Sequence, residues 1–180
     1  SKSGAKFDFE KAKWFNHEYL MATDDAALAE LFKPLLAEHV DVAQFTDEYI
    51  AEAVGTVKNR INFVKDLWTN AAFYFQAPVE YAPKDVKKRW KEDTPKLMGE
   101  LITVLEGIAD FSDAAATEAT MMAWIKGNEY HMGNVMNAFR LTVVGECKGP
   151  HMFEITRLLG KEETIARIKR GVEAIHLPNE

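Results

Sequence analysis

Apolar side chains recur every three or four residues along almost the whole chain, and this helical period is the feature that most restricts the fold. No segment alternates strictly between apolar and polar residues, as a half-buried strand would. The chain has 180 residues, of which 47% are hydrophobic, and this is enough for one sizeable core or two small ones. The sequence therefore predicts an all-α globular protein.

Capping residues and helix breakers divide the first half of this pattern. Pro34 is expected to kink or restart a helix, because proline lacks the backbone donor and clashes with the preceding turn. Thr46 has the side chain of an N-cap and is expected to open a long helical stretch from 47 to 75. Gly55 and Asn59 are the residues that could interrupt it.

Two prolines, Pro78 and Pro83, mark the segment QAPVEYAPKD at 76–85 as an extended connection. This segment is the best candidate for an internal boundary. We therefore expect two consecutive helical subdomains, residues 1–75 and residues 76–180.

The second half contains further helix signals. Thr94 is the expected N-cap of a helix with Pro95 at its first position, and Ser112 is the expected N-cap of the next helix. Gly160 is expected to end a later one. The four tryptophans are expected to lie in the core: Trp14, Trp68, Trp90 and Trp124.

Charge is unevenly distributed. The net charge of −6 argues against a protein that coats nucleic acid without specificity, because that mode needs many cations opposite phosphates. Residues 18–52 hold nine acids and only one base, Lys33, whereas 84–91 (KDVKKRWK) hold five bases and one acid, Asp85. This basic strip is either a contact for a phosphate backbone or a solvated helix face.

The chain lacks the usual signatures of catalysis. Its single cysteine, Cys147, excludes an internal disulfide and thiolate metal clusters, and its histidines lack metal-ligand spacing. No phosphate-binding glycine motif is present. We assign no catalytic residue, metal ligand or cofactor to this chain. Without an apolar run of about 20 residues or a signal-peptide pattern, a cytoplasmic protein is expected.

Two arginines lie in stretches that are otherwise apolar enough to pack. Arg60 is one, and Arg140 is the other, within FRLTVVGECKGPHMF at 139–153. Two glycines and a proline interrupt this second stretch before an apolar helix resumes. Each arginine either caps a carbonyl or pairs with an acid, or it projects its planar fork toward a ligand.

The segment FRLTVVGECKGPHMFEITRLLGKEETIARI at 139–168 resembles the C-terminal region of bacterial glutamyl-tRNA synthetases. The shared pattern is an arginine, an apolar run to glycine, a proline, and an apolar helix ending in Leu-Gly-Lys-Glu. FDFEKAKWFNHEYL at 7–20 resembles the family's Trp-x-Asn-x-x-Tyr segment, here Trp14, Asn16 and Tyr19. The resemblance covers nearly the whole chain, but the HIGH-like and KMSKS-like signatures of the class I catalytic domain are absent.

The resemblance implies a C-terminal fragment of a larger ligase, with two helical subdomains that form an α-helical cage around the anticodon. The first subdomain begins with the end of the stem-contacting region. The missing part of the family's enzymes attaches glutamate to tRNA with ATP and Mg²⁺. The implied partner is tRNA for glutamate, with no DNA and no membrane, and a monomer is expected.

The resemblance also implies an anticodon-binding site. Arg60 falls where the family tests the third anticodon base, and Arg140 falls at another anticodon-contacting arginine. Gly149, Pro150 and Met152 fall where relatives contact unstacked bases, and an arginine plane or an apolar surface suits such bases. Gly149 replaces a polar residue of some relatives, and Met122 replaces an arginine.

Two other interpretations remain open. One is a helical protein-protein interaction module that binds its partner in an apolar groove, with the arginines as interface anchors. The other is a complete helical enzyme that uses an unrecognised histidine and glutamate site.

Overall fold

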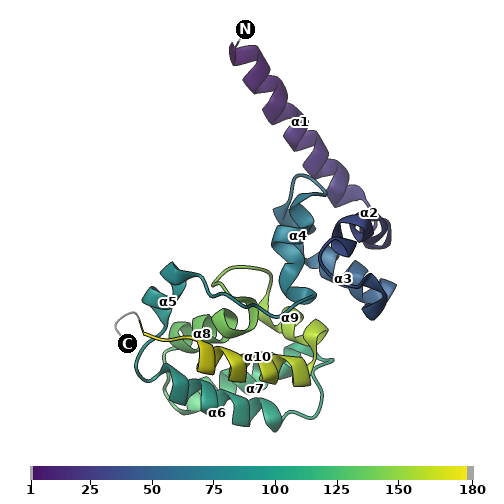
Figure 1. Ribbon diagram of the computed structural model, residues 1–180. Helices are drawn as coiled ribbons and strands as arrows, with labels where there is room; N and C mark the ends of the chain where they lie inside the picture. The colour runs from purple at the N-terminus through teal and green to yellow at the C-terminus, as the bar shows by residue number, and fades with distance from the viewer. Residues whose placement is uncertain (1, 178–180) are drawn as a thin grey trace. The chain divides into compact units, whose positions relative to one another are not determined.

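The structure is a computed structural model that describes residues 2–177, with side chains from Asp8 onward. This part of the chain contains α-helices and short 3-10 helices and no strand (Figure 1). The predicted all-α class is confirmed. The chain divides into two compact units, residues 1–76 and residues 77–180.

The first unit contains four α-helices and three 3-10 helices. The α-helices are α1 (Lys2–Ala22), α2 (Asp25–Ala37), α3 (Asp47–Val57) and α4 (Asp66–Ala71). The 3-10 helices are η1 (Val42–Gln44), η2 (Lys58–Arg60) and η3 (Ala72–Tyr74). The stretch predicted as one long helix from 47 to 75 is therefore four shorter elements.

The core of the first unit is built around the pair α2 and α3. Helix α2 contributes Leu28, Phe32 and Leu36, and α3 contributes Ile50, Val54 and Val57, all without solvent exposure. Helix α2 continues as one element through Pro34, so the expected restart does not occur. Removing these six apolar side chains from water supplies the main stabilisation of the pair.

Of the two residues that could interrupt the stretch from 47 to 75, Asn59 lies at the break, whereas α3 continues through Gly55. A Cβ atom at this position would collide with the carboxylate of Asp25 at the start of α2. The same carboxylate forms an ion pair with Lys58 Nζ at 2.9 Å. Gly55 is therefore a site of close approach between two helices, and the break comes at Lys58 and Asn59 instead.

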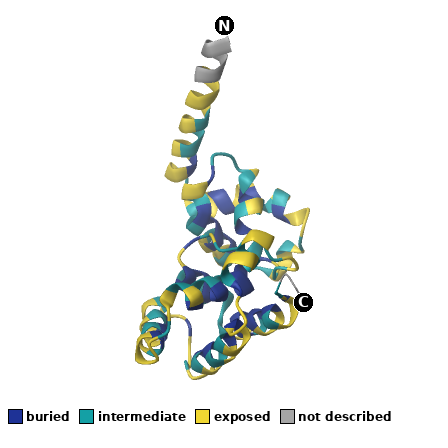
Figure 2. Ribbon diagram, turned by 90° about the vertical axis from the view of Figure 1, so that its left-hand side faces the viewer, coloured by how far each residue is buried: buried dark blue, intermediate teal, exposed yellow. Residues whose placement is uncertain are grey.

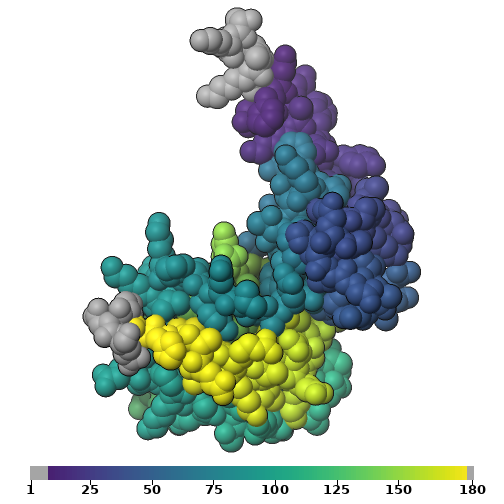
Figure 3. Space-filling model, viewed as in Figure 1, coloured from purple at the N-terminus to yellow at the C-terminus, as the bar shows by residue number. Residues whose placement is uncertain are grey.

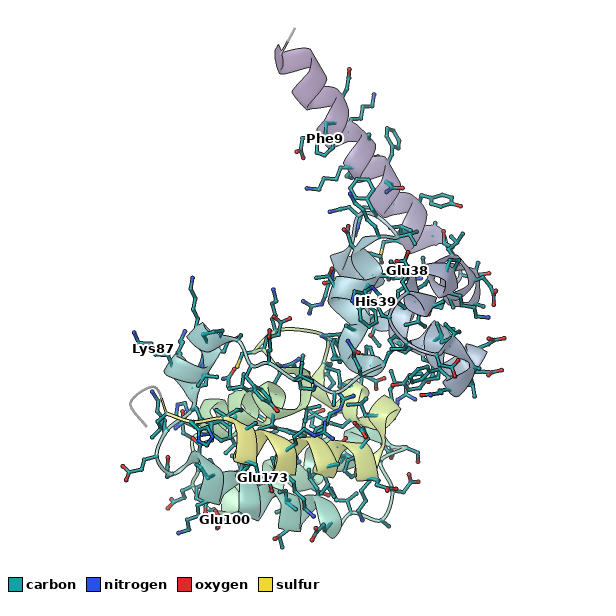
Figure 4. All side chains as sticks on the ribbon, in the orientation of Figure 1. Phe9, Glu38, His39, Lys87, Glu100 and Glu173 are labelled. Atoms are coloured by element: carbon teal, nitrogen blue, oxygen red, sulfur yellow. The ribbon has the colours of Figure 1, made fainter. Side chains whose placement is uncertain are left out.

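Helix α1 exposes aromatic side chains that composition predicts to be buried. Trp14 is 58% exposed, and Phe9, Phe15 and Tyr19 are exposed to a similar extent. Figure 2 shows exposed residues along the length of α1, and Figure 4 labels Phe9 on this helix. The core prediction for Trp14 is wrong because α1 packs on the unit through one narrow face. Trp90, by contrast, is only 2% exposed.

The described residues of the second unit, 77–177, form six α-helices. These are α5 (Pro83–Arg89), α6 (Thr94–Glu106), α7 (Ala114–Gly127), α8 (Met132–Val144), α9 (Met152–Leu159) and α10 (Lys161–Ala174). Helix α8 is central, because it contacts α5, α6 and α10. Its last four residues, 141–144, are all buried.

Helices α8 and α10 approach closely at Gly171, where a Cβ atom would fall 2.6 Å from the Thr142 side chain. Nearby, Arg167 of α10 is only 3% exposed. Its Nη1 donates to the Val143 carbonyl at 2.9 Å, and its Nε donates to Glu163 Oε1 at 2.9 Å. A buried guanidinium thus satisfies a carbonyl at the end of α8, where no intrahelical donor remains.

Two helix starts in this unit differ from the predicted ones. Thr94 Oγ1 accepts from the Lys91 backbone N–H at 2.8 Å, so it closes the preceding turn instead of capping α6. The residue before α7 is Asp113, whose Oδ1 accepts from Ala116 N at 3.1 Å. Ser112 instead donates to Asp110 Oδ2 at 2.6 Å. Both were plausible caps by residue type, and the register of the helix decided the outcome.

Candidate nucleic-acid interface

The segment between α8 and α9, residues 145–151, forms a tight corner in the second unit. Gly145 ends α8 with φ 93°, a left-handed conformation that favours glycine. Its carbonyl accepts from Ala82 N at 2.8 Å. A Cβ atom at Gly145 would fall 2.9 Å from Pro78 Cβ, so the proline-rich connection packs directly against the corner.

The corner returns to helix α8 at Arg140. Gly149 has φ 138°, and a Cβ atom placed there would lie 3.2 Å from Arg140 Nη1. Arg140 is half-buried and Gly149 is also half-buried. The structure therefore brings these two predicted site residues together, with the backbone of the corner lying against the guanidinium group.

Pro150 and Met152 are placed differently. Pro150 is buried and Met152 is 2% exposed. The next residue, Phe153, packs its ring 6.3 Å from that of Phe139 in the core. Pro150 and Met152 thus belong to the core of the unit and not to its exposed surface.

The exposed side chains of the corner are polar. Lys148 is 77% exposed and lies 3.8 Å from Glu146 Oε2, which is a weak ion pair. His151 lies between the two buried residues in sequence, and its Nε2 is 3.2 Å from Glu118 Oε2 on α7. A ligand at this corner would therefore meet charged side chains of both signs before it met apolar surface.

Helix α5 is joined to the corner through Cys147. The backbone N–H of Cys147 donates to Asp85 Oδ2 at 2.9 Å, and its thiol donates to the Asn137 carbonyl at 3.5 Å. Burial raises the pKa of the Cys147 thiol to about 11, and the Asp85 carboxylate adds to this rise. Arg89 and Arg140 oppose it. Helix α5 is thus bonded to the corner through Asp85, and it packs on α8.

Arg60 belongs to the first unit, where it is exposed at the end of η2. The loop that follows it is held by α1. His17 Nδ1 lies 2.7 Å from the Ile61 carbonyl, and Asn16 Nδ2 donates to the Asn62 carbonyl. On the other side, Asp66 Oδ2 accepts from Phe63 N at 3.1 Å. Side chains from α1 and α4 thus fix the backbone next to Arg60.

Sequence reasoning missed the residues that hold these two places. In the sequence, Asp85 was noted only as the single acid in a basic strip, and Asn16 was noted only as part of the Trp-x-Asn-x-x-Tyr segment. Their partners lie 62 and 46 positions away in the chain, so no local pattern identified them.

An apolar hollow of about 500 Å³ lies on the second unit beside α7. Its lining comes from the end of α7 and the start of α8: Met122, Ala123, Ile125, Lys126, Tyr130 and Met132. This is the feature that an apolar-groove interpretation would use.

Among residues 2–177, no helix is long and apolar enough to cross a membrane. The described residues also contain no group of three or more His, Cys, Asp or Glu side chains that could hold a metal ion.

Comparison with known proteins assigns a family to this arrangement. Residues 27–172 match the family described as anticodon binding domain. The chain belongs to the anticodon-binding domain family. The matched range contains Arg60, Arg140 and the whole corner, whereas α1 lies outside it.

Similar proteins include the glutamate–tRNA ligases of Porphyromonas gingivalis, 54% identical, and Bacteroides fragilis, 56% identical, each over 97% of this chain. The chain spans only 34% of the length of these relatives. Among solved structures, a glutamate tRNA ligase from Elizabethkingia meningosepticum matches with a TM-score of 0.83 and 36% identity, over 93% of this chain and 32% of that one. A glutamate-tRNA synthetase from Elizabethkingia anophelis matches with a TM-score of 0.77 and 35% identity, over 91% and 31%.

Proposed function

We propose that this chain is the anticodon-recognition region of a glutamate–tRNA ligase and that its partner is tRNA for glutamate. In the complete enzyme, glutamate would be attached to tRNA with ATP and Mg²⁺ by the part that lies outside this chain, in the cytoplasm. The proposal is supported by the family membership and by relatives that bear this name over nearly all of the chain.

The single observation that carries the proposal to a site is the closeness of Gly149 to the Arg140 guanidinium, because a Cβ atom at Gly149 would lie 3.2 Å from Arg140 Nη1. Single-stranded bases of an RNA loop are recognised by planar cations that stack on them and by donors that read their edges. A guanidinium whose position is fixed by a packed backbone loses little conformational entropy when it binds a base. Arg140 is therefore the leading base-reading residue.

The other four predicted residues receive different roles. Arg60 is proposed to read a second position of the anticodon from its loop in the first unit. Gly149 is proposed to support Arg140. Pro150 and Met152 are proposed to hold the shape of the corner from the core, because both residues are buried.

The test is aminoacylation by the full-length enzyme with Arg140→Ala and, separately, Arg60→Ala. Each change should lower kcat/KM for tRNA. The loss of transition-state stabilisation should be about 1 to 3 kcal/mol, the cost of losing one arginine contact to a base. The KM for ATP should not change. Normal aminoacylation by both variants would contradict the site.

A helical interaction module remains the second candidate, because the hollow beside α7 is apolar. Filter binding separates the two. Preference for tRNA for glutamate over an unrelated tRNA supports the anticodon function, and the absence of any preference in the full-length protein contradicts it.

A further inference from the structure

We infer that the exposed lysines of α5, together with Lys148 of the corner, form a docking face for the phosphate backbone of the bound RNA. We call Lys84, Lys87, Lys88 and Lys148 the basic face. This inference rests on the proposed function, and it adds a second kind of contact. Arg140 would read a base, whereas the basic face would hold the backbone beside it.

The charge of α5 is one-sided. Residues 84–91 contain five bases and one acid, on a chain whose net charge is −6. Lys84, Lys87 and Lys88 are exposed, and no ion pair joins them to a carboxylate in the described part of the chain. The single acid, Asp85, is directed at the corner, where it accepts from Cys147 N. In Figure 4, Lys87 lies at the periphery of the second unit.

Helix α5 is held firmly although it has only seven residues. Its start is joined to the corner by the Ala82–Gly145 backbone bond and by the Asp85–Cys147 bond. Its end is anchored by Trp90, which is 2% exposed. A helix this short would not persist in water without such contacts. The teal segment that contains α5 projects from the second unit in the space-filling view (Figure 3).

The same contacts place the basic face beside Arg140. Helix α5 packs on α8, the helix that carries Arg140, and Lys148 stands between Cys147 and Gly149 in the chain. A loop whose base meets Arg140 would therefore carry its phosphates past several cations. Phosphate contacts of this kind fix the position of a nucleic acid, and base contacts supply its specificity.

The plainer explanation is that basic residues in the last turn of α5 complement the helix dipole. This accounts for Lys87, Lys88 and Arg89, which lie in that turn. It does not account for Lys84, which lies in the first turn, where the dipole disfavours a positive charge. The helix dipole thus explains three of the four basic residues of α5, but not Lys84.

The two explanations differ in how binding responds to salt. Each phosphate contact releases counterions, and it contributes about 0.7 to 0.9 to the slope of log K against log salt concentration. Loss of two contacts should therefore reduce the slope by about 1.5. Helix stabilisation alone predicts an unchanged slope.

The experiment measures the Kd of the full-length protein for transcripts of tRNA for glutamate from about 50 to about 200 mM KCl. The variant is Lys87→Gln/Lys88→Gln, and the matched control is Lys96→Gln/Lys169→Gln, which removes two exposed lysines from α6 and α10. A second pair, Lys84→Gln/Lys148→Gln, leaves the last turn of α5 unchanged. Circular dichroism confirms that all three variants are folded.

The expected result is a smaller salt slope and a similar loss of affinity for native and anticodon-substituted transcripts in both basic-face variants, with neither change in the control. An unchanged slope in both variants would overturn the basic face. Failure of the proposed function has a different signature, because the wild-type protein would then bind native and anticodon-substituted transcripts equally.

Discussion

The two segments next to the predicted arginines, the corner near Arg140 and the loop after Arg60, are stabilised by different kinds of contact. Next to Arg140, the corner depends on backbone conformation, with left-handed glycines and a backbone bond between Gly145 and Ala82. Next to Arg60, the loop depends on side chains, because Asn16 and His17 reach its carbonyl groups from α1. We therefore expect that adding a side chain destabilises the corner, whereas removing a side chain destabilises the loop.

The corner and the loop also differ in which parts of the protein support them. Every element that holds the corner lies within 27–172, the range matched by the family. The loop at Arg60 depends on α1, which lies outside that range. We therefore expect the corner to behave as part of the domain itself and the loop to respond to changes in α1.

The largest effect is expected for Gly145→Ala. The left-handed conformation and the contact with Pro78 should together cost about 2 to 4 kcal/mol of unfolding free energy. Urea unfolding measures it. The matched control is Gly99→Ala on α6, where a Cβ atom meets nothing within 4 Å and helix propensity should add about 0.5 to 1 kcal/mol of stability. Equal effects at the two glycines would contradict the description of the corner.

A smaller effect is expected for Asn16→Ala. Loss of one hydrogen bond to the Asn62 carbonyl should cost about 1 kcal/mol of unfolding free energy. It should also weaken tRNA binding, because the backbone next to Arg60 loses its support. Glu18→Ala, an exposed change on the same helix, is the control. If tRNA binding is unaffected by Asn16→Ala, α1 does not position Arg60.

The smallest effect is expected at Cys147, and it depends on pH. Its pKa is raised from 9.0 to about 11, so the folded chain keeps the thiol proton in a range where the unfolded chain loses it. The resulting stability is fully present below about pH 9 and is lost as pH rises toward 11. Because the thiol is only half-buried, the loss should be on the order of 1 kcal/mol.

Urea unfolding at several pH values, compared between the wild-type chain and Cys147→Ala, isolates this contribution. The difference in unfolding free energy should shrink between pH 9 and pH 11. A constant difference would mean that the corner does not shield the thiol.

The sequence predicted the elements whose signals are local. Helical periodicity predicted the all-α class, and Thr46 is an N-cap whose Oγ1 accepts from Tyr49 N at 3.0 Å. The resemblance assigned Arg140 and Gly149 to the same binding site, and the structure places them close together. The function of that pair remains a proposal.

The features that sequence reasoning missed depend on contacts between distant segments. Gly55 reads as a helix breaker until α2 is packed against it, and Pro150 reads as a surface bend although it is buried. Asp85 has no visible role until Cys147, 62 residues later, is brought to it. Such roles are set by tertiary packing, which neither periodicity nor residue type specifies.

The most direct test of the central claim, that Arg140 reads an anticodon base, is the ratio of kcat/KM for native tRNA to that for tRNA with single anticodon substitutions. Arg140→Ala in the full-length enzyme should reduce this ratio at one anticodon position and leave the other positions unchanged. If Arg140→Ala lowers kcat/KM equally for all of these tRNAs, Arg140 does not read a base.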